Sequence, residues 1–315
     1  MKMGRLPAPQ ILVIGELNVD VVIAGLQAVP KMGFEILARD CELTLGSASA
    51  IFAVGMSKLG HPVTFVSQVG KDQFGNFCID ALKKSGVSTR NVARTDEKTG
   101  VTIALSSSRD RALVTFQGAI STLTAKRFKL SLLKRHQHLH LTSYFLQQGL
   151  QPSFADLFRQ AKTQGLTTSV DPNSDPTGAW SKKINRVLRH TDLLFVNERE
   201  ASNLTGMSTA RSAAKSLGKL VPCAVIKLGG KGAIAIKGNQ VFTDSGFKIK
   251  ARDTTGSGDS FDAGFISAYL RDAPVSECLR IGNACGALSA LRVGGTAGQP
   301  TQQELEDFLR SAEPR

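Results

Sequence analysis

The sequence predicts an α/β protein in which a mostly parallel sheet is covered by helices on both faces. Apolar, strand-like runs alternate along the chain with segments of helical period, which is the pattern of successive βα units. The run at 11–15 is continuously apolar and ends in glycine, as expected for a strand buried on both faces. Further strands are predicted at 63–69, 139–142, 168–170, 193–196 and 224–228.

Helices are predicted where apolar residues recur at helical spacing between these strands. In the first of them, Ser49 is the expected N-cap and Gly60 the expected stop. A later helix begins with the apolar-periodic residues Phe261 and Phe265. The remaining helices are expected at 74–84, 125–133, 154–164, 182–190, 281–291 and 302–309.

Segments that do not follow this alternation predict a small β lobe inserted between the βα units. Strand character returns at 21–24, and 34–45 alternates loosely between apolar and polar residues. The runs at 101–106 and 112–116 form a predicted hairpin around 107–111.

Composition indicates one large domain, 1–315, with enough apolar residues for an extensive core: 42% are apolar and 21% charged. A membrane span is not predicted, because the sequence has no run of 18 apolar residues. The first ten residues lack the apolar segment of a signal peptide. The five scattered cysteines are typical of free thiols, so we expect a cytoplasmic protein.

The net charge is +13, with an isoelectric point near 9.7. The lysines and arginines are dispersed, and two tyrosines and one tryptophan offer few surfaces for base stacking. We therefore expect no nucleic-acid partner. The excess of positive charge is interpreted as a solvated basic surface that also attracts anionic nucleotides.

The stretch 253–265 predicts an anion site with a catalytic carboxylate. After a β-prone run at 247–251, the backbone N–H groups of Gly256, Ser257 and Gly258 are expected to point at a phosphoryl oxygen. Asp259 lies among them, where a carboxylate can orient a substrate hydroxyl and accept its proton. We expect its pKa to be low, because it lies near a helix N-terminus. Taken alone, the stretch is equally well a helix cap after a tight turn.

Polar residues also follow two other predicted strands, where α/β sheets bind ligands. Asn18 and Asp20 follow the first strand, and Asp20 is suited to accept hydrogen bonds from vicinal hydroxyls, although a turn carboxylate is the simpler interpretation. Asn197 and Glu200 are three residues apart at a helix start and can face one site. A capping box explains the same pair locally.

Lys227 lies near the end of the predicted strand at 224–228, and the basic, glycine-rich loop after this strand contains Gly229 and Gly232. Such a loop suits nucleotide phosphates. A hairpin to 233–236 explains the glycines equally well.

Three alternating histidines, His136, His138 and His140, would share one face of a strand. Imidazoles are metal ligands, but neither cysteine nor carboxylate lies beside them in the sequence. We therefore expect a solvent-facing strand edge rather than a metal site.

The stretch from Asp253 to Asp259 resembles the C-terminal signature of the PfkB (ribokinase-like) carbohydrate kinases, typically Asp-Thr-Thr-Gly-Ala-Gly-Asp. It departs from that signature only at Ser257. The segment 70–75 is similar to the family's Gly-x-Asp-x-x-Gly turn, and the resemblance extends over about 11–309. It implies a ribokinase-like three-layer sandwich with a β lid, formed by 34–45 and 101–116, that closes over the sugar.

The segment that opens the first helix resembles the family's N-terminal motif, which begins Gly-Gly and carries Asn five residues after the first Gly. Here Ser47 follows Gly46, and Ile51 stands in the place of the Asn. The resemblance implies that these three residues contact the acceptor together with Asn18 and Asp20. The departures therefore bear on the identity of the acceptor rather than on phosphoryl transfer.

The resemblance also implies roles for the other candidate residues. Asp259 is the base, and Gly256, Ser257 and Gly258 form the anion hole. Asn197 and Glu200 act around the Mg²⁺ and the phosphates, Glu200 through water. The nucleotide-binding residues are then Asn197, Lys227, Gly229, Gly232 and Asn283, and Asp253 with 294–295 would hold a monovalent cation such as K⁺.

The predicted function is that of an ATP-dependent sugar kinase, which transfers the γ-phosphoryl group to a primary hydroxyl of a small sugar. A homodimer through the lid is a further expectation. Two alternatives stay open: a nucleoside kinase of the same family, since a flat base suits the apolar Ile51, and a non-catalytic nucleotide- or sugar-binding protein. A dinucleotide oxidoreductase is not predicted, because no GxGxxG motif follows the first strand.

Overall fold

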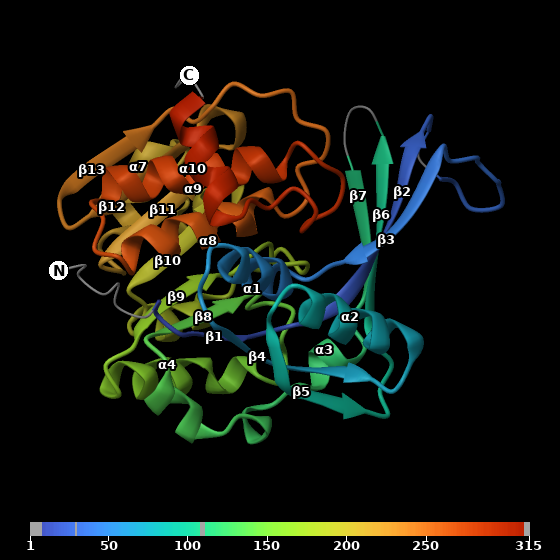
Figure 1. Ribbon diagram of the computed structural model, residues 1–315, viewed down its shortest axis with the longest axis horizontal. Coiled ribbons are helices and arrows are strands. Elements are labelled where there is room, and N and C mark those ends of the chain that lie inside the picture. Colours follow the sequence, from blue (N-terminus) through green and yellow to red (C-terminus); the bar gives the residue numbers. More distant parts are fainter. Residues whose placement is uncertain (1–7, 29, 108–110, 312–315) are drawn as a thin grey trace.

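A nine-stranded sheet forms the centre of the computed structural model, which describes residues 8–28, 30–107 and 111–311 (Figure 1). All neighbouring strands are parallel except at one edge, where β11, β12 and β13 are antiparallel. The strand order is β13 (Gln240–Asp244), β12 (Ala233–Lys237), β11 (Cys223–Lys227), β10 (Leu193–Asn197), β9 (Thr167–Asp171), β8 (His138–Thr142), β1 (Ile11–Ile14), β4 (Val63–Gly70) and β5 (Ser88–Thr95).

Helices cover both faces of this sheet, as predicted, and bury two separate apolar cores against it. One face carries α1 (Ala48–Lys58), α2 (Gln73–Lys84), α8 (Ser257–Tyr269), α9 (Val275–Ser289) and α10 (Gln302–Ser311). The other carries α4 (Phe154–Thr163), α5 (Asn185–Leu188), α6 (Glu198–Thr205) and α7 (Ala210–Leu217). Short connections include α3 (Ala119–Thr122) and the 3₁₀ turns η1 (Ala125–Arg127), η2 (Leu130–Arg135), η3 (Gln151–Ser153), η4 (Lys182–Ile184) and η5 (Gly229–Lys231).

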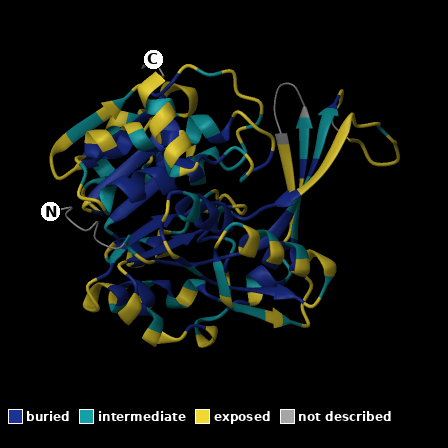
Figure 2. Cartoon of the chain, viewed as in Figure 1, coloured by how far each residue is buried: buried dark blue, intermediate teal, exposed yellow. Residues whose placement is uncertain are grey.

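The continuous apolar runs are explained by this three-layer arrangement, because successive side chains of a strand point to opposite faces. In β1, Ile11 and Val13 join one core while Leu12 and Ile14 join the other, and all four are buried. The prediction of a strand covered on both faces is confirmed. Figure 2 shows the same pattern across the central strands.

A second, four-stranded sheet stands away from the main one at the other end of the molecule (Figure 1). Its order is β3 (Asp40–Leu45), β2 (Asn18–Leu26), β6 (Gly100–Ser107) and β7 (Arg111–Phe116). The predicted strand at 34–45 is only half correct, because 34–39 do not pair with any described strand. The tip of the predicted hairpin, 108–110, lies outside the described residues.

Several predicted elements differ from the structure. The helix expected at 125–133 is two 3₁₀ turns, because Phe128 between them is extended and directs its side chain into the core. The β-prone run at 247–251 forms only an isolated bridge at Phe247 and otherwise follows the wall of a cavity. Two further predicted helices have different bounds. The segment 182–190 is a 3₁₀ turn followed by α5, and the helix predicted at 281–291 begins earlier, at Val275.

The histidines do not form a solvent-facing edge, because β8 lies in the middle of the sheet. His138 and His140 are completely buried. The hydroxyls of Thr167 and Ser169 lie 2.7 Å from the two ring nitrogens of His138, and His140 stacks on Phe52. Burial lowers the pKa of His138 to about 3, so both rings are neutral parts of the core.

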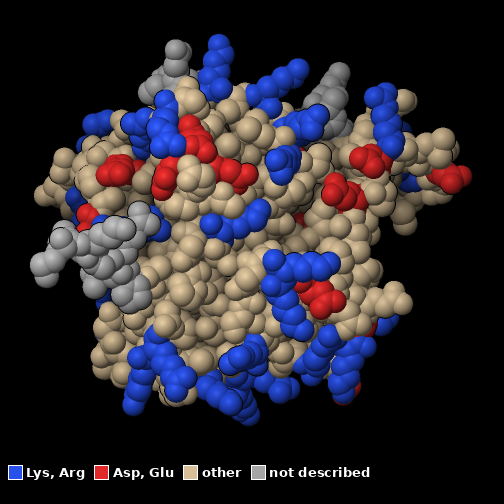
Figure 3. All heavy atoms as spheres, in the orientation of Figure 1, with Lys and Arg blue, Asp and Glu red and all other residues tan. Residues whose placement is uncertain are grey.

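None of the helices in the described part of the chain has both the length and the apolar character that a bilayer crossing requires. Figure 3 shows lysine and arginine side chains spread over the viewed face rather than gathered in one patch.

Candidate active site

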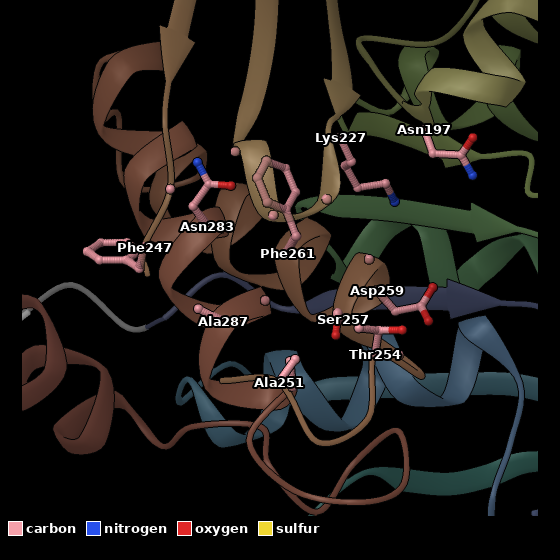
Figure 4. Close-up of a pocket in the computed structure, with 18 of the residues that line it drawn as sticks. Asn197, Lys227, Phe247, Ala251, Thr254, Ser257, Asp259, Phe261, Asn283 and Ala287 are labelled. Carbon is pink, nitrogen blue, oxygen red and sulfur yellow. The ribbon is translucent and has the colours of Figure 1, made fainter. Parts of the chain in front are cut away.

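A cavity of about 540 Å³ opens at the carboxyl ends of β9, β10 and β11, beside the N-terminus of α8. This is the edge where parallel sheets bind their ligands. Ten of the predicted site residues line it: Asn197, Glu200, Lys227, Gly229, Gly232, Gly256, Ser257, Gly258, Asp259 and Asn283. Figure 4 shows its two ends, one with Asn197, Lys227 and Asp259, the other with Asn283, Phe247 and Ala287.

The start of α8, where the anion site is predicted, makes a sharp turn that glycine permits. Gly256 is the N-cap, in the left-handed region with φ 70°, and a Cβ on it would lie 2.8 Å from Gly295 Cα. The amide of Ser257 donates to the Thr254 carbonyl at 3.2 Å, so the expectation that it is free is wrong. The amides of Gly256 and Gly258 have no hydrogen-bond partner among the described residues.

Asp259 lies in the first turn of α8 and faces the cavity. The expectation of a low pKa for this carboxyl is wrong. Burial raises its pKa to about 7; Lys227 opposes the shift, while Asp171, Glu16 and Glu200 add to it. The helix N-terminus does not offset desolvation among so many carboxylates.

Lys227, the last residue of β11, does not direct its ammonium to open space. Its Nζ lies 2.6 Å from Asp171 Oδ2 at the end of β9 and 3.1 Å from Asp262 Oδ1 in α8. The side chain still lines the cavity, and its assignment to the nucleotide stays a prediction.

Asn197 and Glu200 form the capping box of α6. The Asn197 side chain accepts from the Glu200 amide at 2.9 Å, and Glu200 Oε2 accepts from the Asn197 amide at 2.9 Å. Burial and Asp171 raise the pKa of Glu200 to about 7, while Lys227 lowers it. The local capping interpretation is therefore correct, and Glu200 also lines the cavity.

The glycine-rich loop after β11 closes another wall of the cavity. Gly232 has φ 87°, and a Cβ there would collide with the backbone of 244–246, so the hairpin explanation accounts for this glycine. Asn283 of α9 donates through Nδ2 to Asp244 Oδ1 at 2.5 Å, which fixes its amide at the apolar end of the cavity.

The predicted acceptor residues lie outside this cavity lining, at the base of the small sheet. Asn18 Nδ2 donates to Asp20 Oδ1 at 3.0 Å. A Cβ on Gly46 would collide with the Asp20 carboxylate, so glycine is required at this close approach. Ser47, rather than Ser49, is the N-cap of α1, and its hydroxyl donates to the Glu16 carbonyl at 2.6 Å. Ile51, also on α1, is only 3% exposed.

Asp253 connects the two loops that flank the anion site. Its Oδ1 accepts from the Thr255 amide at 2.9 Å and its Oδ2 from the Gly294 amide at 2.9 Å. The carboxylate therefore holds the 294–295 loop beside the start of α8.

Three buried carboxylates of this region were not among the predicted site residues: Glu16, Asp171 and Asp262. Glu16 Oε2 accepts from Ser49 Oγ at 2.6 Å, which explains why Ser49 is not the cap. A signal existed for each of them, since Glu16 follows β1 by two residues, Asp171 ends β9 and Asp262 follows Asp259 by about one helical turn. The carboxylate oxygens of Asp171, Asp259 and Asp262 lie within 4.8 Å of one another.

Known proteins with similar sequences and structures are kinases. Residues 8–302 match the model of the pfkB family carbohydrate kinases. The chain is 29% identical to a ribokinase from Haemophilus influenzae over 310 residues, covering 95% of this chain and 98% of that protein. It is 30% identical to a 2-dehydro-3-deoxygluconokinase from Bacillus subtilis over 282 residues, covering 84% and 86%.

The fold is similar to that of a putative ribokinase II from E. coli solved with ATP and Mg²⁺, with a TM-score of 0.85 and 25% identity over 96% of this chain and 99% of that one. The anion site at α8, the small second sheet and these likenesses lead to one assignment. The chain belongs to the pfkB family of carbohydrate kinases, phosphotransferases with an alcohol group as acceptor, and it has the ribokinase-like fold.

Proposed function

We propose that this kinase transfers the γ-phosphoryl group of ATP to a primary hydroxyl of a small sugar or sugar derivative. The observation that carries the proposal is the position of Asp259, which faces the cavity beside the amides of Gly256 and Gly258. A carboxylate next to an anion site can accept the proton of a hydroxyl while the amides stabilise charge on the transferred group.

The nucleotide is proposed to occupy the cavity, with its phosphates at the end that contains Asp259 and Lys227 and its base near Asn283 and Phe247. The lining fits this arrangement, because one end carries charged groups and the other carries apolar groups with a single amide. Glu200 fits a Mg²⁺ that it holds through water, since it lines the cavity and has no lysine or arginine paired with it among the described residues. Bound Mg²⁺ would neutralise charge on the phosphates.

A monovalent cation, K⁺, is proposed at Asp253. The carboxylate and the nearby 294–295 loop offer oxygen ligands, and the cation would order the loops on both sides of Gly256.

For the acceptor, we propose a hydroxylated sugar-like molecule held by Asn18 and Asp20. Their amide and carboxylate, 3.0 Å apart, are suited to two neighbouring hydroxyls. The apolar Ile51 favours an acceptor that lacks one hydroxyl, because a hydroxyl buried there would lose its hydrogen-bond partner. The relative named 2-dehydro-3-deoxygluconokinase agrees with such a deoxy acceptor. A nucleoside acceptor is the alternative that the same residue supports; because Ile51 is only 3% exposed, it offers little surface to either kind of acceptor and does not separate the two.

An ATP-consumption screen tests the proposal. The purified enzyme would be offered ribose, fructose, matched deoxysugars, 2-dehydro-3-deoxygluconate and nucleosides, with phosphorylated products identified by mass spectrometry. We expect a deoxysugar or deoxysugar acid to have the highest kcat/KM, at least tenfold above its hydroxylated counterpart. A nucleoside as the best acceptor, or turnover of none, would contradict the proposal.

A homodimer through the lid and a cytoplasmic location complete the proposal. The lid strands expose Leu113, Val114 and Phe116, each more than half exposed, on a sheet that a second copy could cover. The five cysteines are free, as in a reducing compartment. Light scattering of the purified protein would report the oligomeric state.

A further inference from the structure

Lys227 is held between two buried carboxylates that come from different layers of the fold. Asp171 ends β9, Lys227 ends β11 and Asp262 lies in the second turn of α8. The side chains of Asp171 and Asp262 are 2% and 1% exposed, and that of Lys227 is 14% exposed. The two ion pairs therefore connect the carboxyl edge of the sheet to the helix that carries Asp259.

The ammonium also lies directly below the anion site. A Cβ built on Gly258 would lie 3.1 Å from Lys227 Nζ, so the lysine tip and the Gly258 backbone are in close approach. A side chain at 258 would press on the ammonium, which would have to give by a few tenths of an ångström. Asp262 and Asp259 are three residues apart on α8, so they face the same side of the helix.

The charges explain why the lysine stays in place. Burial alone disfavours the ammonium, but Asp171 and Asp262 outweigh burial and raise the pKa of Lys227 above its ordinary range. An ammonium has three donors, and these carboxylates take at least two of them. Burial also raises the pKa of Asp262 well above its ordinary value; Lys227 opposes that shift, while Asp171 and Asp259 add to it.

We propose that Asp262 is a positioning residue of the kinase: with Asp171 it fixes the Lys227 ammonium beneath Gly258, and thereby holds the first turn of α8 in register with the sheet edge. The inference rests on the proposed function for its kinetic test. The Asp262 carboxylate contacts Lys227, and it also lies within 4.8 Å of the Asp259 and Asp171 carboxylates, so the double-mutant cycle with Lys227 measures how much of its effect passes through the lysine.

The test is a double-mutant cycle of Asp262→Asn and Lys227→Met, with Asp272→Asn as matched control. Asp272 is exposed and follows the same helix, so its replacement changes the same charge away from the cavity. We expect Asp262→Asn to lower kcat by about 10- to 100-fold, because small misplacement of reacting groups has effects of this size. The KM values for ATP and acceptor should stay within about threefold. The double variant should be no slower than the slower single variant, since the two residues act as one unit.

Hydrogen exchange gives a readout that needs no acceptor. Amides at 256–260 should exchange faster in Asp262→Asn than in wild type or Asp272→Asn, while distant helices keep their protection.

Three results would overturn the inference: unchanged kcat in Asp262→Asn, a loss that appears mainly as a raised KM for ATP, or losses that multiply in the double variant. Unchanged exchange at 256–260 would overturn it as well. If Asp262→Asn does not fold, a cycle of Asp171→Asn with Lys227→Met is judged by the same criteria. Failure of the proposed function would appear separately, as a wild-type enzyme that phosphorylates no sugar but still shows the exchange difference.

Discussion

Ile51 packs directly against Gly256, the N-cap of the helix that carries Asp259. A Cβ on Gly256 would lie 3.0 Å from Ile51 Cγ2, and one on Gly295 would lie 2.5 Å from Ile51 Cδ1. The isoleucine therefore fills the space between the anion site and the 294–295 loop. Ile51, which the family resemblance places beside the acceptor, therefore also packs against the start of α8.

Replacing Ile51 should test this support. We expect Ile51→Ala to lower the free energy of unfolding by about 2–4 kcal/mol, because the side chain is 3% exposed and its removal leaves a cavity. Ile51→Val should lower it by about 1 kcal/mol and serves as the graded control. Urea unfolding measures both. An alanine variant as stable as wild type would show that the isoleucine makes no such packing contribution.

Replacing Asp259 should separate binding from chemistry. We expect Asp259→Asn to keep its affinity for ATP and to lose about 10²–10⁴ in kcat, the usual contribution of a general base. Calorimetric titration with ATP and steady-state kinetics with the best acceptor measure the two effects. A variant with near wild-type kcat would remove Asp259 from its assigned role.

The pH dependence of activity should follow the raised pKa of Asp259, about 7. A base acts in its ionised form, so kcat/KM should rise about tenfold per pH unit below that pKa and level off above it. The rise of kcat/KM below pH 7 should be absent from the residual activity of Asp259→Asn.

The free energy of unfolding should change with pH in the opposite direction to activity: it should fall as the pH rises. Between the ordinary aspartate pKa, about 3.9, and 7, the native state keeps a proton that the unfolded chain has lost. The stabilisation from Asp259 is therefore complete below pH 4 and is lost as the pH rises through 7. Glu200, with a pKa of about 7, changes in the same direction. A free energy of unfolding that increases from pH 5 to 8 relative to Asp259→Asn would contradict this assignment.

Glu200 has two separable roles, the α6 cap and the proposed Mg²⁺ site. Glutamine also completes a capping box, so Glu200→Gln should keep the thermal midpoint while raising the Mg²⁺ concentration for half-maximal activity several-fold. Glu200→Ala should in addition lose about 1 kcal/mol of stability. Equal Mg²⁺ requirements in wild type and Glu200→Gln would leave Glu200 with the capping role alone.

Exchange of Na⁺ for K⁺ at constant ionic strength should raise the activity of the wild-type enzyme. The cation would order the loops that Asp253 already connects through Thr255 and Gly294. Asp253→Asn should respond much less to K⁺, and choline chloride controls for ionic strength. Identical rates in both salts would leave Asp253 as a turn residue.

Much of this protein was determined by local pattern in the sequence. Continuous apolar runs predicted the central strands because burial on both faces leaves no polar position in them, as in β1 and β10. The glycines and the aspartate at 256–259 predicted a turn and a helix start, and these line the cavity, because small residues at a helix N-terminus leave backbone amides accessible. Ten predicted residues accordingly line one cavity.

Only the tertiary structure decided the electrostatic properties of the site, because these depend on groups that lie far apart in the sequence. The pKa of Asp259 depends on Asp171, Glu16 and Glu200, which only the parallel sheet brings beside it, so a local helix-dipole prediction had the wrong sign. The direction of the Lys227 ammonium was likewise decided by carboxylates 56 and 35 residues away. Electrostatic energies in a buried site depend on distances through space and on exclusion of water, and the sequence pattern specifies neither.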